Sequence, residues 1–547
     1  MTEGREFSVT TPLGSDVLLF DYMSGQDEIG RCFQFELGLL SEDLNITADQ
    51  ILGKPVTVSA QPGGLGETRY FNGLVSEFRL DEITEGYAHY VAIVKPWLWF
   101  LSLSEDCKIF QNLSIPDIIE EVFSEYGTAT YEVRLQGSYD PVEFCVQFNE
   151  SDLNFVERLM QKVGIFYYFE HADGEHTLVL TNDVAALESV PGFAEIPFRS
   201  DESSRFEDFE AFSSWSPIGS VTTGEFTHTD YDFTKPAADL MTKSSDPQGH
   251  DGADAEIYRY PGIYHQISAG DALAVVHRQE VQAIASRIRA KGTIRGLWSG
   301  ALFSLTNHPR DAENAEFCVL RCEYKLWGPE YRSDSDREGV TFEISLVAQP
   351  SSLPYSPPRT APIPVSPGPQ TATVVGPGGE EIFTDEYSRV KVQFHWDRIG
   401  GNDENSSCFV RVSSAWAGTN WGFIQIPRIG QEVIVDFLDG DPDKPIITGR
   451  VYNAANRPPY ELPGNATQSG WKSNSSPGGG GFNELRFEDK AGSEEVYFQA
   501  QKDHTELIKN DENRTVQNNM SERVDVDSSQ SIGNNRTEDV VDLSFPT

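Results

Sequence analysis

Two kinds of residue are scarce in this chain of 547 residues: cysteines and basic residues. The six cysteines lie far apart, which is unlike the dense disulfide framework of a small secreted protein. Two of them, Cys318 and Cys322, lie in a predicted strand with no histidine nearby, which argues against a zinc site. We therefore expect core residues or free thiols at Cys318 and Cys322; the other four cysteines are Cys32, Cys107, Cys145 and Cys408.

The charge balance is strongly acidic, because 42 Lys and Arg residues accompany 85 Asp and Glu residues. The net charge of −43 would repel phosphate, so nucleic acid is not expected as a partner. No segment approaches the roughly 18 apolar residues of a membrane-spanning helix. The N-terminal residues, MTEGREFSVTTPLG, contain no apolar signal region. We expect a protein that starts in the cytoplasm without a signal peptide, and that needs another machine to leave the cell.

Residues 1–350 alternate short apolar strands with three predicted helices, which is typical of an α+β region dominated by strands. The first predicted helix covers residues 114–127, with Ser114 as its cap and Gly127 at its end, and the second covers residues 151–164 and ends at Gly164. The third is Ala-rich and is expected over about residues 271–291, ending in Arg287, Arg289 and Lys291. A chain of this length should contain about two to four domains.

A proline-rich segment, residues 349–370, precedes a compact block of strands at residues 371–455. Such a segment should run extended and semi-rigid. Within the block, residues 389–396 alternate strictly between apolar and polar side chains. About 85 residues of strands with this pattern suit a small five-stranded barrel. Residues 456–482 are polar and glycine-rich, and we expect a linker there.

The last 45 residues, 503–547, carry an aliphatic residue at every eighth position. Five of their seven Ile and Val residues share this phase, which random placement would give in roughly one sequence in a thousand. An even period returns a side chain to the same face of a strand-and-turn unit, and a single aliphatic column can be buried only against neighbours. We expect several chains to form a needle packed on Ile508, Val516, Val524, Ile532 and Val540. The alternative is a disordered polar tail.

The sequence contains no complete catalytic or metal-binding motif. His171 and His176 form the closest histidine pair, but a metal site needs more ligands than these. Asp439, Asp441 and Asp443 resemble calcium ligands in spacing, yet the glycine and glutamate of an EF-hand are missing, so a hairpin turn is expected. We expect no enzymatic activity, no cofactor, and no catalytic, cofactor-binding or metal-binding residues.

Nucleic-acid binding is the alternative function for the barrel, because barrels of this size often bind oligonucleotides. Basic residues that could contribute are Arg389, Lys391, His395, Arg398 and Arg411, although the net charge opposes this function. The tryptophans Trp396, Trp416 and Trp421 are expected in the barrel core, with packing between subunits as the alternative.

The order of these segments resembles the VgrG family, the spike proteins of type VI secretion. In the barrel the resemblance is carried by DEYSRVKVQFHWDR, RVSSAWAGTNWG and IPRIGQEVIVDFLDGDPDKPIITGRVYN, and before the octads by NELRFEDKAGSEEVYFQAQKDH. The N-terminal half contributes YFNGLVSEFRL, SDLNFVERLMQKVGIFYYFEH, TDYDFTKP and YRYPGIY. The match runs in one order over nearly the whole chain.

The resemblance implies a mostly β protein with a phage tail hub-like α+β domain at residues 1–365. It further implies an OB-fold barrel at residues 371–455 and a trimeric intertwined β-helix at residues 483–547. Family members are homotrimers that sit on the Hcp tube and baseplate, are tipped by a PAAR-repeat protein, and carry effectors, some through adaptors. A contractile sheath drives them through the target membrane, so they are secreted by the type VI system.

The C-terminal part differs in two features from the family and from related phage spikes. Family octads often carry glycine two residues after the valine, whereas this chain has Asn510, Asn518, Val526, Asn534 and Asp542. Related phage spikes also carry a lysozyme between barrel and needle, which leaves a peptidoglycan-degrading phage-type spike as an alternative. The gap here is about 28 residues, too short for a catalytic domain, and we expect no toxin domain after Thr547.

Overall fold

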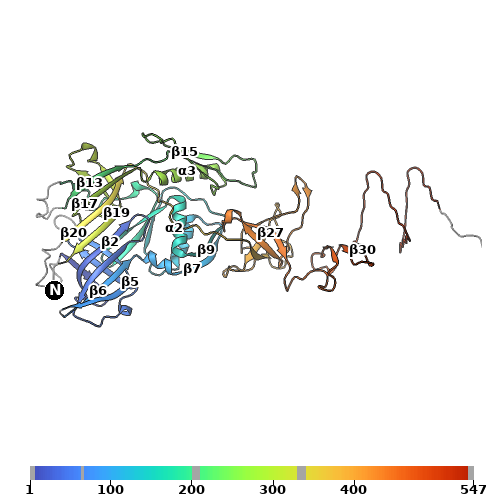
Figure 1. Cartoon of the computed structure of the whole chain (residues 1–547), viewed down its shortest axis with the longest axis horizontal. Coiled ribbons are helices and arrows are strands. Elements are labelled where there is room, and N and C mark those ends of the chain that lie inside the picture. Colours follow the sequence, from blue (N-terminus) through green and yellow to red (C-terminus); the bar gives the residue numbers. More distant parts are fainter. Residues whose placement is uncertain (1–5, 63–66, 85, 200–209, 329–340, 540–547) are drawn as a thin grey trace, which may run out of the picture. The chain divides into compact units, whose positions relative to one another are not determined.

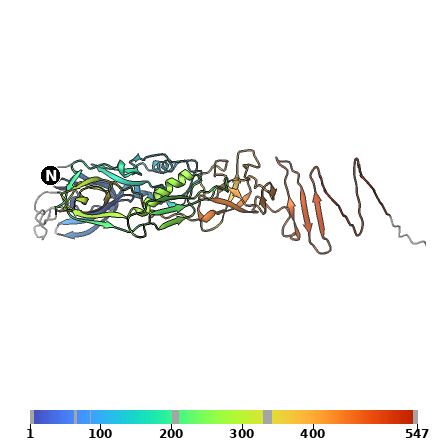
Figure 2. The same ribbon diagram turned by 90° about the horizontal axis from the view of Figure 1, so that it is seen from above.

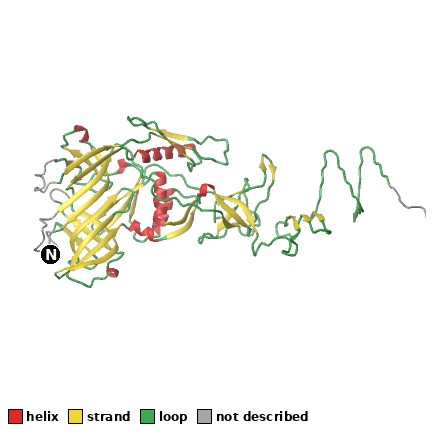
Figure 3. Ribbon diagram, viewed as in Figure 1, coloured by secondary structure: helices red, strands yellow, loops and turns green. Residues whose placement is uncertain are grey.

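The computed structural model describes residues 6–62, 67–84, 86–199, 210–328 and 341–539, and strands dominate them (Figure 3). The chain divides into two compact units, residues 1–456 and residues 457–547. The first unit contains the hub segment, residues 1–365, and the barrel, residues 371–455 (Figure 1). The second unit contains a small sheet followed by the octads.

The hub segment is built on a 12-stranded sheet. Its antiparallel path is β1 (Phe7–Thr10), β4 (Pro55–Ala60), β5 (Arg69–Thr84), β6 (Tyr87–Lys95), β3 (Gln34–Ser41), β2 (Leu19–Glu28), β19 (Glu316–Trp327), β20 (Thr341–Pro350), β17 (Ser286–Gly292) and β13 (Phe212–Gly219). Strand β18 (Leu302–Thr306) joins β19 to β12 (Glu195–Pro197). In β19, Cys322, Tyr324 and Leu326 are buried while the residues between them are exposed, the period of two expected of a strand.

Helices α1 (Ile115–Ser124) and α2 (Asp152–Val163) confirm the first two predicted helices. Ser114 Oγ accepts the main-chain N–H of Asp117, which confirms the predicted cap of the first helix. Ser151 Oγ accepts that of Asn154, so the second helix has a serine cap as well. Helix α2 ends at Gly164, whose φ of +78° is a left-handed conformation that glycine adopts without steric cost. Both helices bury their apolar faces in the core of the hub segment.

The third predicted helix is wrong in its second half. Helix α3 covers Ile267–Gln282, and the residues after it form strand β17 between β13 and β20. The basic residues that suggested a helix end alternate in β17 with Ile288 and Ala290, which are buried. Because this segment pairs with a strand on each side, its buried and exposed residues alternate with a period of two. The tertiary pairing therefore overrides the local helical pattern.

Smaller sheets complete the hub segment. Strand β7 (Glu105–Phe110) pairs with β9 (Cys145–Ser151), and β10 (Phe166–Ala172) pairs with β11 (Glu175–Thr181), which also pairs with β8 (Tyr131–Arg134). Strand β14 (Glu225–His228) lies between β15 (Thr242–Ser245) and β16 (Glu256–Arg259), and helix α3 packs against this sheet.

The barrel contains the predicted five strands. Their order is β22 (Lys391–Phe394), β21 (Gln370–Val375), β26 (Glu432–Phe437), β27 (Pro445–Val451) and β23 (Arg411–Val412), and a hairpin of β24 (Ala417–Gly418) and β25 (Trp421–Gly422) extends from them. The strict alternation of residues 389–396 places Val390, Val392 and Phe394 in the barrel core. The predicted alternation is therefore confirmed.

The barrel core is completed by strand β9 of the hub segment. Phe144, Val146 and Phe148 belong to the same buried cluster as the apolar residues of β21, β22 and β26. The Phe148 ring lies 5.8 Å from that of Trp396. The two segments, which the sequence separates by a linker, therefore share one hydrophobic core.

The predicted linker before the barrel is fixed to the hub segment rather than free. We call residues 359–366 the strap. Its main-chain N–H groups at Thr360 and Ala361 donate to Gln161 Oε1 at 2.8 and 2.9 Å. Its N–H at Ser366 donates to the carbonyl of Gly440 in the barrel at 2.8 Å. These contacts hold the strap in place.

The second unit begins with a three-stranded antiparallel sheet of β28 (Gln468–Lys472), β29 (Glu484–Glu488) and β30 (Glu495–Gln499). Strand β28 lies inside the segment predicted as a linker, residues 456–482. From residue 500 to residue 539 the described chain contains neither helix nor strand, and it doubles back repeatedly (Figure 2).

Candidate functional site

The sheet of the second unit exposes an apolar face. Leu485 of β29 lies opposite Trp471 of β28 on one side and opposite Phe498 of β30 on the other. Phe487 of β29 lies opposite Val496 of β30. Because alternate residues of a strand share a face, these five side chains lie together. All but Leu485 are exposed. We call this set the apolar sheet face: Trp471, Leu485, Phe487, Val496 and Phe498.

The opposite face of the same sheet is polar and less exposed. Glu484 is buried, and Arg486 forms an ion pair with Glu495 at 3.0 Å. An isolated soluble sheet would turn its apolar side inward and its charges outward. This unit has the reverse arrangement, which indicates a surface that is covered by other chains.

The aliphatic octad residues also lie partly open in the single chain. Their exposed fractions are 41% for Ile508, 44% for Val516, 50% for Val524 and 45% for Ile532. Of the apolar residues outside the octad phase, Leu507 and Val526 are far more exposed, at 79% and 88%, whereas Met520 is 56% exposed. Val540 lies outside the described residues. The four described members of the column therefore have similar exposed fractions, between 41% and 50%.

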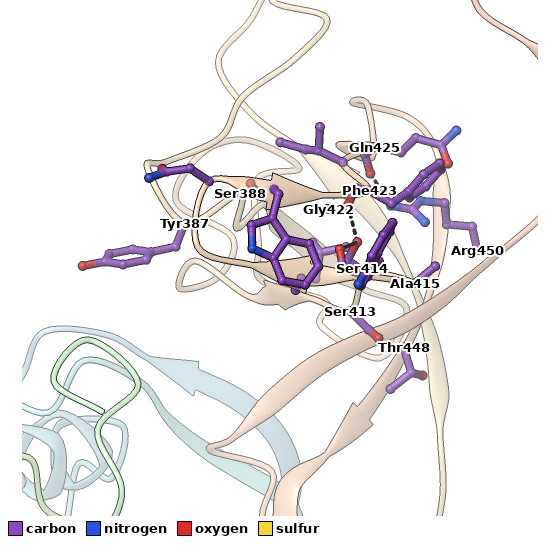
Figure 4. Close-up of a pocket in the computed structure, with 16 residues that line it drawn as sticks. Tyr387, Ser388, Ser413, Ser414, Ala415, Gly422, Phe423, Gln425, Thr448 and Arg450 are labelled. Atoms are coloured by element: carbon purple, nitrogen blue, oxygen red, sulfur yellow. Dashed lines mark hydrogen bonds between the residues drawn. The ribbon is translucent and has the colours of Figure 1, made fainter. Parts of the chain in front are cut away.

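The β24–β25 hairpin of the barrel carries Trp416 and Trp421 at a pocket whose lining residues include Phe423 and Arg450 (Figure 4). Trp416 and Trp421 contact edge to face, with ring centroids 5.0 Å apart, and they are 64% and 57% exposed. Together with Phe423, Ile424 and other residues they line a cavity of about 730 Å³. The hairpin therefore carries a second apolar surface, in the first unit.

The prediction of a core position for these two tryptophans is wrong. The hairpin strands have only two residues each, so they extend from the barrel and cannot reach its interior. Trp396 does belong to the core: it stacks on Phe394 at 5.0 Å and donates from Nε1 to Gln370 Oε1 at 2.8 Å. Packing between subunits, the alternative for the hairpin tryptophans, fits their exposure.

The basic residues considered for nucleic-acid binding are engaged within the protein. Arg389 pairs with Asp385 at 2.6 Å and Arg398 with Asp106 at 2.5 Å. Lys391 donates to the carbonyl of Glu404, and His395 Nε2 lies 3.1 Å from Thr371 Oγ1. The guanidinium of Arg411 stacks on the hub residue Phe233. These contacts, together with the net charge, weigh against a nucleic-acid groove.

The histidine pair is held by main-chain and amide groups. His171 and His176 face each other across the β10–β11 hairpin. His176 Nε2 accepts the N–H of Trp97 at 2.9 Å, and its Nδ1 lies 2.7 Å from Asn72 Oδ1. Burial lowers the pKa of His176 to about 4. Among the described residues no group of three His, Cys, Asp or Glu side chains could hold a metal ion.

The aspartate-rich segment is a turn between β26 and β27, as predicted. Asp441 Oδ1 accepts the N–H of Asp443 at 3.0 Å, and Asp443 Oδ1 accepts the N–H of Val146 in the hub segment at 2.7 Å. Cys318 and Cys322 are buried free thiols, as predicted, and the other four cysteines are free as well. Burial raises the thiol pKa of Cys145, Cys318 and Cys408 to about 12, so these thiols are unreactive.

Known protein families match the chain in three consecutive segments. The phage tail baseplate hub (GPD) family matches residues 26–329, and the type VI secretion system/phage-baseplate injector OB domain matches residues 382–452. The bacteriophage T4 gp5 C-terminal trimerisation domain matches residues 469–544. The last match includes both the apolar sheet face and the octads.

Individual relatives agree with these families. The type VI secretion system spike protein VgrG1a of Pseudomonas aeruginosa is 45% identical over 514 residues, covering 94% of this chain and 80% of that protein. The actin cross-linking toxin VgrG1 of Vibrio cholerae is 35% identical, covering 91% of this chain and 45% of the toxin. The structure of the E. coli c3393 protein, a type VI component similar to T4 gp27 and gp5, superposes with a TM-score of 0.58 at 17% identity, covering 81% of this chain and 100% of that one.

No helix in the described part of the chain is long and apolar enough to cross a membrane. The hub-like sheet, the barrel and the trimerisation segment follow one another as in these relatives. The chain therefore belongs to the VgrG family, the spike proteins of the type VI secretion system.

Proposed function

We propose that this protein works as a homotrimer whose needle is stiffened by apolar surfaces that one chain leaves open. The observation that carries the proposal is the inverted sheet of the second unit, with its apolar sheet face outward and Glu484 buried. Three copies that turn this face to a common axis would remove Trp471, Val496 and Phe498 from water. Burial of each such side chain contributes roughly 1.5–3 kcal/mol, which supports a stable assembly.

The octads continue this packing along the needle. Three chains wound about one axis would stack Ile508, Val516, Val524, Ile532 and Val540 as aliphatic rings, while Asn, Asp and Ser remain outside. Strand edges would be paired between chains, so that the shaft has no open edge. A rod of this kind resists bending and fraying, the mechanical requirement of a puncturing tip.

The tryptophan hairpin provides a second contact between subunits in the barrel. Trp416 and Trp421 form a rigid aromatic anchor, and the cavity beside them, lined also by Tyr387 and Arg450, is large enough for side chains of another copy. Aromatic anchors in pockets dominate the energy of many protein interfaces. The trimer would then be fixed at both the barrel and the needle.

In this arrangement residues 1–365 form the hub and residues 371–455 the OB barrel. Residues 456–482, with strand β28, connect the barrel to the needle at 483–547. As in the family, the trimer would cap the Hcp tube on the baseplate, carry a PAAR-repeat tip protein, and deliver effectors, directly or through an adaptor. It would assemble in the cytoplasm and leave by the type VI system.

The role is mechanical rather than enzymatic. His171, His176, Asp441 and Asp443 are held in structural hydrogen bonds. The relative from Vibrio cholerae named as a toxin is a longer protein, of which this chain covers 45%. We infer that the residues of this chain supply the spike and that any toxic activity belongs to attached effectors.

Light scattering after size exclusion, at several concentrations, tests the trimer. The expected result is a stable species of three chains, each of 60.9 kDa. A monomer at every concentration would contradict the proposal. The variants Trp471→Ser and Phe498→Ser each remove one side chain of the apolar sheet face and leave the hub unchanged. Each should shift the equilibrium from trimer towards monomer.

A further inference from the structure

The octad column by itself does not decide how three chains align along a needle. Ile508, Val516, Val524, Ile532 and Val540 are all aliphatic and repeat every eight residues. If one chain slips by eight residues, its aliphatic side chains still meet aliphatic side chains, and only the ends of the column lose a partner. A pattern whose units are alike specifies its register weakly. Another part of the chain must therefore align the copies.

The charged residues of the octads add little discrimination between registers. Arg523 pairs with Asp525 at 2.7 Å, and Arg536 pairs with Glu538 at 3.1 Å. Each pair joins residues two positions apart in one chain, so it forms whatever the alignment of the other chains is. All four side chains are at least 58% exposed, and exposed ion pairs contribute little free energy. These pairs therefore do not select one register.

The sheet before the octads presents a pattern that does not repeat. The apolar sheet face combines three aromatic and two aliphatic side chains of different size, Trp471, Leu485, Phe487, Val496 and Phe498. Its three strands are paired within one chain, whereas residues 500–539 contain neither helix nor strand (Figure 2). Displacing one copy along such a face would bring a ring opposite a smaller side chain and leave a void, which packed interfaces tolerate poorly. The face therefore has one preferred alignment with further copies.

The first octad is tied to this sheet by a short connection. Gln501, two residues after β30, donates its N–H to Asn483 Oδ1 at 2.8 Å, and its Oε1 accepts the N–H of Phe482 at 3.1 Å. Only six residues separate Gln501 from Ile508. An octad that slipped by eight residues would have to stretch this connection or expel eight residues from the needle as a loop.

We propose that the apolar sheet face sets the register of the octads. Three copies of the face meet in one alignment, and the connection after Gln501 transmits that alignment to Ile508 and to the column beyond it. The occupant of the face is a second copy of this chain, because the trimerisation-domain match at residues 469–544 includes both the sheet and the octads. The octads contribute length and stiffness, while the sheet decides which residues of neighbouring chains face each other. This role rests on the trimer proposed above.

Disulfide mapping in mixed trimers tests the register. Two full-length chains, one with Val516→Cys and one with Val524→Cys, are produced together and oxidised, and peptide mass spectrometry identifies the disulfides. With a single register, the introduced cysteines join only at like positions, 516 to 516 and 524 to 524. A mixed disulfide between positions 516 and 524 reports a slip of one octad and should stay at background. Mixed disulfides as abundant as the like pairs would overturn the proposal.

An insertion uncouples the sheet from the octads without altering either of them. Eight flexible residues of Gly and Ser, placed after Glu506, lengthen the connection, while the sheet can still hold the trimer together. Mixed disulfides should then rise from background to the level of the like pairs. The same insertion after Ser531 is the matched control, because it lies beyond both introduced cysteines, and it should leave mixed disulfides at background. Mixed disulfides that stay at background after both insertions would show that the octads set their own register, which contradicts the proposal.

Light scattering on the same samples separates the register from the trimer itself. A monomer of the unmodified chain at every concentration would contradict the trimer and, with it, the role of the sheet. A trimer whose octads keep one register after the insertion at Glu506 would contradict the role of the sheet alone.

Discussion

The guanidinium carbon of Arg411 lies 4.6 Å from the centre of the Phe233 ring. This contact joins a strand of the barrel to a loop of the hub segment. Arg389 lies over the same ring at 5.2 Å while it pairs with Asp385. Phe233 thus lies against two cations of the barrel. Through this ring, two basic residues of the barrel contact the hub segment.

Loss of this contact should weaken the connection between hub and barrel. Phe233→Ala removes the ring from both guanidinium groups, and we expect about 1–2 kcal/mol of lost stability. Urea unfolding of the full chain measures it. A double-mutant cycle with Arg411→Ala separates the pair from its surroundings, and an interaction energy of zero would show that the two residues do not cooperate.

A charge in the aliphatic column should fray the needle. Val524→Asp would bury three carboxylates in a trimer, at a cost of several kcal/mol each before relaxation. The expected result is a lower melting temperature of the needle with an unchanged hub. Val526→Asp is the control, since Val526 is two residues away, out of phase and 88% exposed. Equal effects of the two variants would argue against a packed column.

The tryptophan hairpin should contribute to assembly. Trp421→Ala removes one ring of the Trp416–Trp421 pair. We expect the trimer of this variant to dissociate at a higher protein concentration, because loss of an aromatic anchor typically costs about 2 kcal/mol or more of association free energy. Light scattering across a dilution series measures this. Ile399→Ala, an equally exposed apolar position of the barrel that does not line the cavity, should leave assembly unchanged.

The buried histidine should make the hub segment sensitive to acid. The folded-state pKa of His176, about 4, lies below its ordinary value of 6.5, so the folded state binds the proton less tightly than the unfolded state. Stability is therefore lost as the pH falls below 6.5, reaching about 2 kcal/mol near pH 5. Protonation of Nε2 would also break its bond to the Trp97 N–H.

The measurement is urea unfolding of the hub at pH 7.5 and pH 5.0, for the unmodified chain and for His176→Gln. The variant should lose less stability on acidification, although it is less stable at neutral pH. An unaltered pH dependence would contradict the assignment.

Much of this protein follows from local sequence. The caps of α1 and α2, Ser114 and Ser151, lie next to the turns they stabilise, and the alternation through Val390, Val392 and Phe394 fixes a strand face whatever its partners are. The phase of Ile508, Val516, Val524 and Ile532 is likewise a property of the chain alone. Each of these signals lies within a few residues of the structure that it specifies.

Contacts between distant segments decided the rest. Residues 286–292 are a strand because β13 and β20 flank them, and Trp416 and Trp421 are exposed because a short hairpin carries them away from the barrel. Val146 completes a core more than two hundred residues further along the chain, a pairing that no local pattern encodes. Sequence periodicity determines which face of an element is apolar, whereas only tertiary packing determines what that face is buried against.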